Sequence, residues 1–403
     1  MRSKFRHFCS MVALAAASAV ASQAAPPEHA ILWVVDGFSS QAPDRVNLKN
    51  LKALMKEGVY YRNNYTVQTA DPSGQPGMWS EYHTSSIPNP VLLAGTAMLL
   101  PGKQHYVQES FFPLKITAHA VNEISYRALN VGFHFTAQAG GQLMIRAGYK
   151  TGDDRTLYWA TQFLKVAHPA FMLIHMQDTG FAGGASRTAP PGSPYKDNIW
   201  GEGSPYMKTV AQQDVYLGQF IDELKKEGIW DKTIIFITGD HGQTTLGWHP
   251  PEASDAWTMP LVMAGPGIKK GQTFDYAESI DVVPTLCYLM GVRPPINSDG
   301  RILAEALVDP PKDVPPRQQK IKELDFLLLD VQKKLEALEA KAPRGRRDIR
   351  DMSPLAQAER DFYRIERILE WHQFGTYDRL IAHHKALLQR LNAMAANGGA
   401  AGN

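Results

Sequence analysis

Short apolar runs alternate with amphipathic stretches over the first three quarters of the chain. Four runs rich in β-branched residues are typical of strands: 30–35, 170–176, 233–238 and 261–264. Apolar residues recur at helical spacing over 48–56 and 215–226. Short apolar strands that alternate with helices predict an α/β fold, in which a mostly parallel sheet is sandwiched by helices.

The pattern changes after two proline pairs, at 310–311 and 315–316. Apolar positions then repeat at alternating steps of three and four along three stretches, which predicts three amphipathic helices. The positions are Ile321, Leu324, Leu328, Val331, Leu335 and Leu338; Leu355, Ala358, Phe362, Ile365, Leu369 and His372; and Tyr377, Leu380, His384, Leu387, Leu391 and Met394. We expect the two histidines to pack within these stripes. The sequence thus predicts an α/β domain over 25–310 and a helical, coiled-coil-like appendage over 311–403.

Composition excludes several classes of protein. In 403 residues, 44% are apolar and 20% are charged, which is ordinary for a globular chain and excludes general disorder, a coiled-coil rod and a polytopic membrane protein. Three basic residues precede an apolar stretch of 8–20, and small residues follow it, so residues 1–24 are predicted to be a cleaved signal peptide. We therefore expect a periplasmic or secreted protein with no transmembrane segment in its mature chain.

The net charge of +2 is a composite. Residues 311–403 hold 17 basic and 13 acidic groups, a balance of +4, and the domain before them is left at −5 once the signal peptide is removed. This division favours docking of the helices on that domain, or self-association through them. The basic residues between 344 and 350 fit either such docking or a solvated turn. No segment signals nucleic-acid binding, and Cys287, alone in the mature chain, is expected to be a buried structural residue.

Chemically active side chains follow three of the predicted strands. Asp36 comes after 30–35, Asp178 after 170–176, and Asp240 with His241 after 233–238. Because parallel strands end at one edge of a sheet, these groups are expected to lie close together. Carboxylates with an imidazole suit zinc or manganese, although an Asp-Gly pair such as 36–37 also fits a simple turn. His175, within its strand, is expected to be a core residue.

A serine at 86 stands before a predicted helix. In the segment Ser86-Ile87-Pro88-Asn89-Pro90, a proline fits the first turn of a helix that continues through 91–98. A hydroxyl at this point either caps the helix or meets a phosphate-like anion at its N-terminus.

The order of these motifs resembles the alkaline phosphatase superfamily, and most of all its nucleotide pyrophosphatase/phosphodiesterase type. The resemblance covers about 30–305 and is carried by Asp36-Gly37, Ser86-x-Pro88-Asn89, Asp178, Asp240-His241-Gly242 and Gly265-Pro266-Gly267. The segments 281–286 and 299–301 are similar to the closing part of the sulfatase domain.

The resemblance implies roles for individual residues. A divalent cation, in the first place zinc, with manganese or magnesium as alternatives, would bind Asp36, Ser86, Asp240 and His241, and Ser86 would be the nucleophile. Asn89 would donate a hydrogen bond to the phosphoryl group. A second cation would use Asp178 and His249, but Phe181 or Ala182 stands where the family has another histidine, so either one or two ions are expected.

The predicted function is hydrolysis of a small phosphorylated substrate, of the phosphodiesterase or phosphonate type, through a covalent phosphoserine. Transfer of the phosphoryl group to an alcohol is an alternative within enzymes. Sulfatase-like hydrolysis is a weaker one, because sulfatases place an arginine where this chain has Pro90. A binding or scaffold protein with a degenerate metal site is the alternative outside enzymes.

Overall fold

The computed structural model describes residues 26–66, 82, 117–121, 142–146, 152–249, 254–295, 298–313, 316–339, 341, 353–362 and 376–397. Within these ranges eight strands form one sheet in the order β4-β3-β5-β1-β6-β7-β2-β8. The strands are β1 (His29–Val35), β2 (Val59–Tyr65), β3 (Thr117–Val121), β4 (Gln142–Arg146), β5 (Phe171–Met176), β6 (Thr233–Gly239), β7 (Thr258–Ala264) and β8 (Gln272–Glu278). The signal peptide predicted over 1–24 lies outside the described residues.

The sheet is mixed, with one strand reversed. β7 pairs antiparallel with both β6 and β2, and every other recorded pairing is parallel. β1 lies between β5 and β6, with Val35 opposite Met176 on one side and Gly239 on the other. The carboxyl ends of these three central strands therefore meet at one edge, as the sequence predicted.

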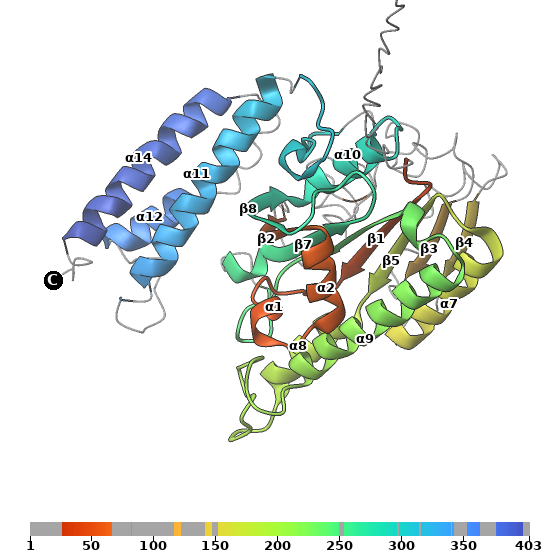
Figure 1. Ribbon diagram of the computed structural model, residues 1–403. Coiled ribbons are helices and arrows are strands. Elements are labelled where there is room, and N and C mark those ends of the chain that lie inside the picture. The colour runs from red at the N-terminus through yellow and green to blue at the C-terminus, as the bar shows by residue number, and fades with distance from the viewer. Residues whose placement is uncertain are drawn as a thin grey trace, which may run out of the picture.

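Helices cover both faces of the sheet (Figure 1). On one face α2 (Lys49–Glu57), α7 (Asp153–Ala167) and α9 (Pro205–Lys226) bury large side chains such as Phe163 and Phe220 against Trp33. On the other face α10 (Ser279–Leu289) packs Val283 and Cys287 against Leu32. Cys287 is buried, and all seven residues of β1 are buried, because this strand has a layer of helix on each side.

The predicted fold class is confirmed, and the boundaries show where the sequence signal was weak. The four predicted strands correspond to β1, β5, β6 and β7, and the predicted helices to α2 and the second half of α9. β2 and β8 were missed because each mixes tyrosines with charged or amide side chains, as in Val59–Tyr65, and neither gives a clean apolar run. The short helix α1 (Ala42–Arg45) also escaped prediction.

The C-terminal helices form a separate bundle beside the sheet (Figure 1). It consists of α11 (Pro316–Glu339), α12 (Pro354–Phe362) and α14 (Tyr377–Ala396). Their shared core includes Val331, Phe362 and Leu387, and His384 is buried beside it, with its Nδ1 2.9 Å from the carbonyl of Leu380. His372 and the basic segment 344–350 lie outside the described residues. Across the described ranges no helix combines the length and apolarity that crossing a bilayer requires.

The bundle touches the domain along edge strand β8. α11 contacts this strand, and the ammonium of Lys333 lies 3.7 Å from Asp275, with both side chains half exposed. An exposed ion pair of this kind contributes little stability.

A buried ion pair joins the first turn of α10 to Arg301. Asp281, in the first turn of α10, accepts backbone hydrogen bonds from Glu278 (3.0 Å) and Arg301 (2.8 Å), and its Oδ2 lies 3.5 Å from Nε of Arg301. Nη1 of Arg301 also donates to both carboxylate oxygens of Glu305, at 3.0 and 3.1 Å. The two segments that resembled the sulfatase domain thus meet as a structural clamp.

Asp281 should make the stability of the protein depend on pH. Burial raises the pKa of its carboxyl to about 6, although the Arg301 guanidinium opposes the shift. Because the raised pKa favours the protonated form in the folded state, this contribution is complete below about pH 4 and is lost as the pH rises to 6. Denaturation of wild type and Asp281→Asn from pH 4.5 to 7.5 should show wild type losing about 2 kcal/mol relative to the variant, since part of the contribution is already lost at pH 4.5. A difference that stays constant with pH would contradict this role.

Candidate metal site

Asp36 and Gly37 form the turn that leaves β1. Gly37 has a φ of 63°, in the left-handed region that glycine tolerates best. Its N–H donates to Oδ1 of Asp240 (3.0 Å), and its carbonyl accepts the hydroxyl of Tyr206 (2.8 Å). The Asp-Gly pair is thus a turn, and the same turn holds Asp36 next to Asp240.

Asp240 and His241 follow β6, the strand beside β1. Oδ1 of Asp240 also accepts the N–H of His241 (2.8 Å), so this oxygen is saturated and Oδ2 is directed elsewhere. Nδ1 of His241 lies 2.8 Å from the carbonyl of Gly242, to which only a protonated nitrogen can donate. The neutral imidazole therefore carries its lone pair on Nε2, as in a histidine that binds metal through that nitrogen.

These three side chains converge on one point. Nε2 of His241 lies 3.5 Å from Oδ1 of Asp36 and 3.6 Å from Oδ2 of Asp240. The three donor atoms lie within 4.8 Å of one another, and this is the single such group of three among the described residues. Burial, and next the charge of Asp240, raise the pKa of the Asp36 carboxyl well above its usual range. A buried carboxylate, a partly buried one and an imidazole nitrogen fit a divalent cation such as zinc or manganese.

His175 lies behind Asp240. It is 1% exposed, within β5, and its Nε2 is 3.9 Å from Oδ2 of Asp240. Burial, with a smaller contribution from His241, lowers the pKa of His175 to about 3, so the ring stays neutral at ordinary pH. The expectation of a core histidine agrees with this burial.

Asp178 does not join the group of three. It is the first residue of α8 (Asp178–Thr188), and its Oδ2 accepts the N–H of Asp153 (3.0 Å) at the start of α7. Asp153 is fully buried and accepts in return the N–H groups of Gln177 (2.8 Å) and Asp178 (3.0 Å), together with the amide of Gln213 (2.6 Å). These bonds fix the junction between β5 and α8. Gln177 in turn hydrogen-bonds the carboxylate of Asp36.

Helix α8 packs against the site through its glycines. A Cβ added to Gly180 would overlap Oδ1 of Asp36, and one added to Gly183 would overlap Nε2 of Gln243. The Gln243 side chain is buried, and its amide has no hydrogen-bond partner among the described residues. Phe181, where the family has a histidine, is 53% exposed. The chain is helical as far as 188 because these contacts outweigh the poor helix propensity of glycine.

His249 lies beside the group rather than in it. Its ring centre is 4.3 Å from that of His241 and 4.1 Å from that of Trp248. Gly247, with a φ of 82°, turns the loop so that Thr244 and Trp248 are hydrogen-bonded to each other. The loop thereby stacks two aromatic rings on the edge of the site.

Of the predicted site residues, the structure brings together Asp36, Asp240 and His241. Asp178 and His249 lie outside that group of donor atoms, and a second cation held by them stays a prediction. Ser86 and Asn89 lie outside the described residues. The sequence analysis missed Asp153 and Gln177, which orient the site, and it gave no role to Gly180. The one sequence signal for Gly180 was the Gly180-x-x-Gly183 spacing, which places both glycines on one face of a helix.

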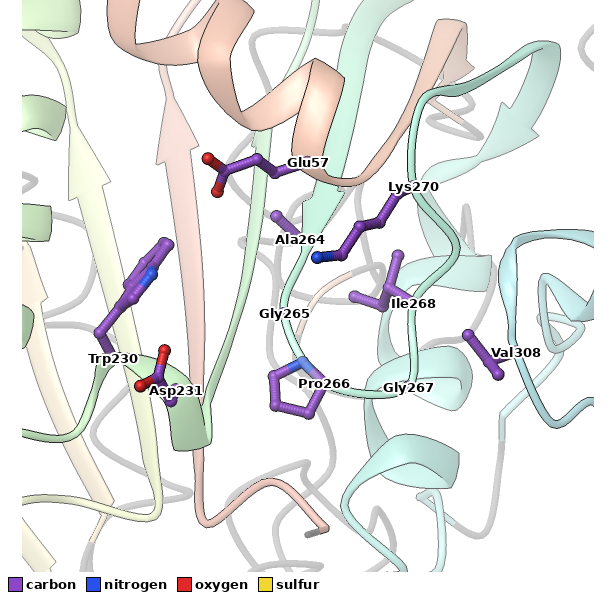
Figure 2. Close-up of a pocket in the computed structure, with 10 residues that line it drawn as sticks. All are labelled: Glu57, Trp230, Asp231, Ala264, Gly265, Pro266, Gly267, Ile268, Lys270 and Val308. Carbon is purple, nitrogen blue, oxygen red and sulfur yellow. The ribbon is translucent and has the colours of Figure 1, made fainter. Parts of the chain in front are cut away.

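A separate pocket lies at the opposite edge of the sheet (Figure 2). It measures about 340 Å³ and is lined in part by Trp230 and Asp231, just before β6, and by Gly265, just after β7. Glu57 and Lys270 also line it. Asp240 and His241 follow the carboxyl end of β6, whereas the pocket lies at its amino end. The pocket is therefore not part of the candidate metal site.

Part of the α/β domain is similar in sequence to a known protein family. Residues 102–292 match the family model described as Sulfatase. The matched residues make up a little under half of the chain and are similar to that family. The match includes Asp178, Asp240 and His241, and begins after Asp36 and Ser86 in the sequence.

Individual proteins are similar to part of the chain. The multifunctional alkaline phosphatase superfamily protein PehA of Trinickia caryophylli is 34% identical over 112 residues, which are 26% of this chain and 22% of PehA. Lipoteichoic acid synthase 1 of Bacillus subtilis (strain 168) is 34% identical over 99 residues, 22% of this chain and 16% of that protein. The chain thus spans less than a quarter of either relative's length.

A solved structure shares the fold. The phosphonate monoester hydrolase SpPMH from Silicibacter pomeroyi superposes with a TM-score of 0.53 at 19% identity, over 71% of this chain and 78% of that one.

Proposed function

We propose that this protein is a metal-dependent hydrolase of phosphate or phosphonate esters. The observation that carries the proposal is the convergence of Asp36, Asp240 and His241 at the carboxyl ends of adjacent strands, with Nε2 of His241 facing both carboxylates. The names of PehA and SpPMH, an alkaline phosphatase superfamily protein and a phosphonate monoester hydrolase, support this class of substrate. The predicted signal peptide supports a periplasmic or secreted location.

Tyr82 supports the assignment of Ser86 as nucleophile. Its hydroxyl donates to the carbonyl of Gly239 (2.6 Å), the residue before Asp240, so position 82 is anchored at the site. Ser86 is four residues further on, and four residues span at most about 14 Å. The chain can therefore bring Ser86 to the three donors.

The proposed reaction has two steps. Oγ of Ser86 loses its proton and bonds to phosphorus as the ester oxygen leaves with a proton, and water then cleaves the phosphoserine and restores the hydroxyl. Asp36, Asp240 and His241 hold the cation, which when bound supplies Lewis acidity that lowers the pKa of a nearby hydroxyl and offsets phosphoryl charge. Asn89 donates a hydrogen bond to a non-bridging oxygen. Gln177 and Gly37 keep the two carboxylates in place.

Metal removal and a substrate screen test the proposal. The purified protein should hold about one zinc or manganese per chain by elemental analysis. With it, the protein should hydrolyse p-nitrophenyl esters of phosphate, phenylphosphonate or a phosphodiester at least a hundredfold faster than after chelation, because a Lewis acid contributes several kcal/mol to such a transition state. Zinc, manganese and magnesium are then added back separately to identify the effective cation.

The same screen separates the alternatives. Ser86→Ala should abolish hydrolysis while the metal content is retained at about one ion or slightly less. Preferential cleavage of p-nitrophenyl sulfate would favour the sulfatase alternative. The similarity of residues 102–292 to the sulfatase family supports this alternative. Product formation that requires an added alcohol would indicate a transferase. A chain without bound metal and without any esterase activity would be a binding protein, and the proposal would be wrong.

A further inference from the structure

A stack of four side chains leads from the candidate metal site to the surface. The guanidinium of Arg187, on α8, lies 4.8 Å over the ring of Trp248. Trp248 stacks on His249 at 4.1 Å and 29°, and His249 lies 4.3 Å from His241. The outermost member is therefore a cation held in a fixed place, three layers from a proposed metal ligand.

The guanidinium of Arg187 keeps its donors available. The described residues offer it no carboxylate or carbonyl partner, and its recorded contact is the ring of Trp248. The next acidic residue after Arg187 in the sequence, Asp197, pairs with Lys196 at 3.0 Å, and the ammonium of Lys196 also donates to the backbone carbonyl of Arg187 (2.6 Å). By contrast, Arg45, stacked in the same way on Trp200, donates to Gln41. Arg187 thus presents an unneutralised planar fork to solvent, suited to an oxyanion.

The carboxylates around the candidate metal site favour a further positive charge nearby. Asp36, Asp240, Asp178 and Asp153 all lie at this edge of the sheet, and a single divalent ion does not offset four carboxylates. An anionic substrate is repelled by this edge unless a further positive charge faces it. Trp248, over which Arg187 lies, is 44% exposed, and Leu246 in the same loop is 58% exposed, so this loop offers apolar surface that suits a carbon linker.

We propose that Arg187 binds a second anionic group of the substrate, a phosphate, sulfate or carboxylate carried on the far end of the leaving group. The inference rests on the proposed function, since it assumes that the scissile ester lies at Asp36, Asp240 and His241. It adds a substrate class to that function: esters with two anionic groups separated by a short, apolar linker. Trp248 positions the guanidinium, and Arg187 itself touches the substrate.

Binding of two non-hydrolysable ligands tests this without catalysis. Hexane-1,6-bisphosphonate and hexylphosphonate share one phosphonate and one alkyl chain, and differ in the second anionic group. By calorimetry on the metal-loaded full chain, wild type should bind the bisphosphonate about tenfold more tightly, the size expected for a charged hydrogen-bonded contact. Arg187→Met, which keeps the stem over Trp248, should bind both ligands alike, and Arg187→Lys should retain part of the preference.

A control variant removes a similar cation elsewhere. Lys225 lies 5.8 Å over Trp230, at the opposite edge of the sheet, and Lys225→Met should keep the full preference. Thermal denaturation should show all variants folded, because both cations are exposed. Equal binding of the two ligands by wild type, or an unchanged preference in Arg187→Met, would overturn the proposal.

The outcome is separable from that of the proposed function. A preference that Arg187→Met abolishes, in a protein without esterase activity, would support the anion subsite and refute the hydrolase. Esterase activity, together with a bisphosphonate preference that Arg187→Met leaves unchanged, would support the hydrolase and refute the anion subsite.

Discussion

Replacing Asp240 with asparagine should remove the divalent cation and leave the fold intact. Oδ1 of Asp240 accepts two backbone N–H groups, from Gly37 and His241, and the amide oxygen of asparagine can accept both. Oδ2, which faces Nε2 of His241 at 3.6 Å, would become an NH₂ group with no charge and no lone pair for a metal. One substitution thus separates the structural half of this carboxylate from its metal-binding half.

The expected effect of Asp240→Asn is large and specific. Loss of several kcal/mol of transition-state stabilisation corresponds to about a thousandfold fall in kcat/KM. Elemental analysis should find less than a tenth of the wild-type metal, while the thermal unfolding of the metal-free proteins stays similar.

A matched control exists in Asp214, on α9. It is also buried and accepts backbone N–H groups, from Asn50 (3.1 Å) and Leu51 (2.8 Å), at the start of α2. Asp214→Asn should keep full metal content. Full metal content in Asp240→Asn would instead show that the cation, if any, binds elsewhere.

Replacing Gly180 with alanine should lower both the stability of the protein and its affinity for metal, although Gly180 is not a metal ligand. An alanine in the interior of an exposed helix normally stabilises it by about 0.5–1 kcal/mol relative to glycine. Here the new methyl group would overlap Oδ1 of Asp36, which is held by its turn and by Gln177, so either α8 or the carboxylate must move. We expect a loss of about 2–3 kcal/mol in unfolding free energy, typical of overpacking, and metal affinity lower by at least tenfold.

Gly184 offers the comparison on the same helix. A Cβ at Gly184 would meet no atom within 4 Å, so Gly184→Ala should be neutral or slightly stabilising. Chemical denaturation and metal titration of the two variants side by side check both effects. If Gly180→Ala resembled Gly184→Ala, the packing of α8 on Asp36 would not matter for the site.

The part of the site that the sequence predicted is the part that follows from parallel topology. Asp36 and Asp240 each come directly after an apolar run, and two adjacent parallel strands must end side by side. Nothing comparable marks Asp153, whose carboxylate acts on a junction 24 residues later through backbone hydrogen bonds. Such a partnership depends on how α7 meets β5 in space, which no local pattern encodes.

The same limit explains why the sequence did not predict α8. Its glycines argue against a helix by intrinsic propensity, and they are compatible with one only because Asp36 and Gln243 lie against them. Strand β8 was missed for a related reason: it is exposed over its first half and buried over its second, so neither alternation nor a continuous apolar run appears.

The adjacency of β1 and β6 links metal binding to the order of folding. The two aspartates of the site come from segments joined by more than 200 residues of chain, and the hydrogen bond from Gly37 to Asp240 spans 203 positions. Closing so long a loop is slow, and it precedes any complete set of donors. A cation that binds only after this pairing stabilises the fully folded domain by mass action. It does not stabilise a partly folded chain in which β1 is still unpaired. Capture of metal would therefore mark the completion of the sheet.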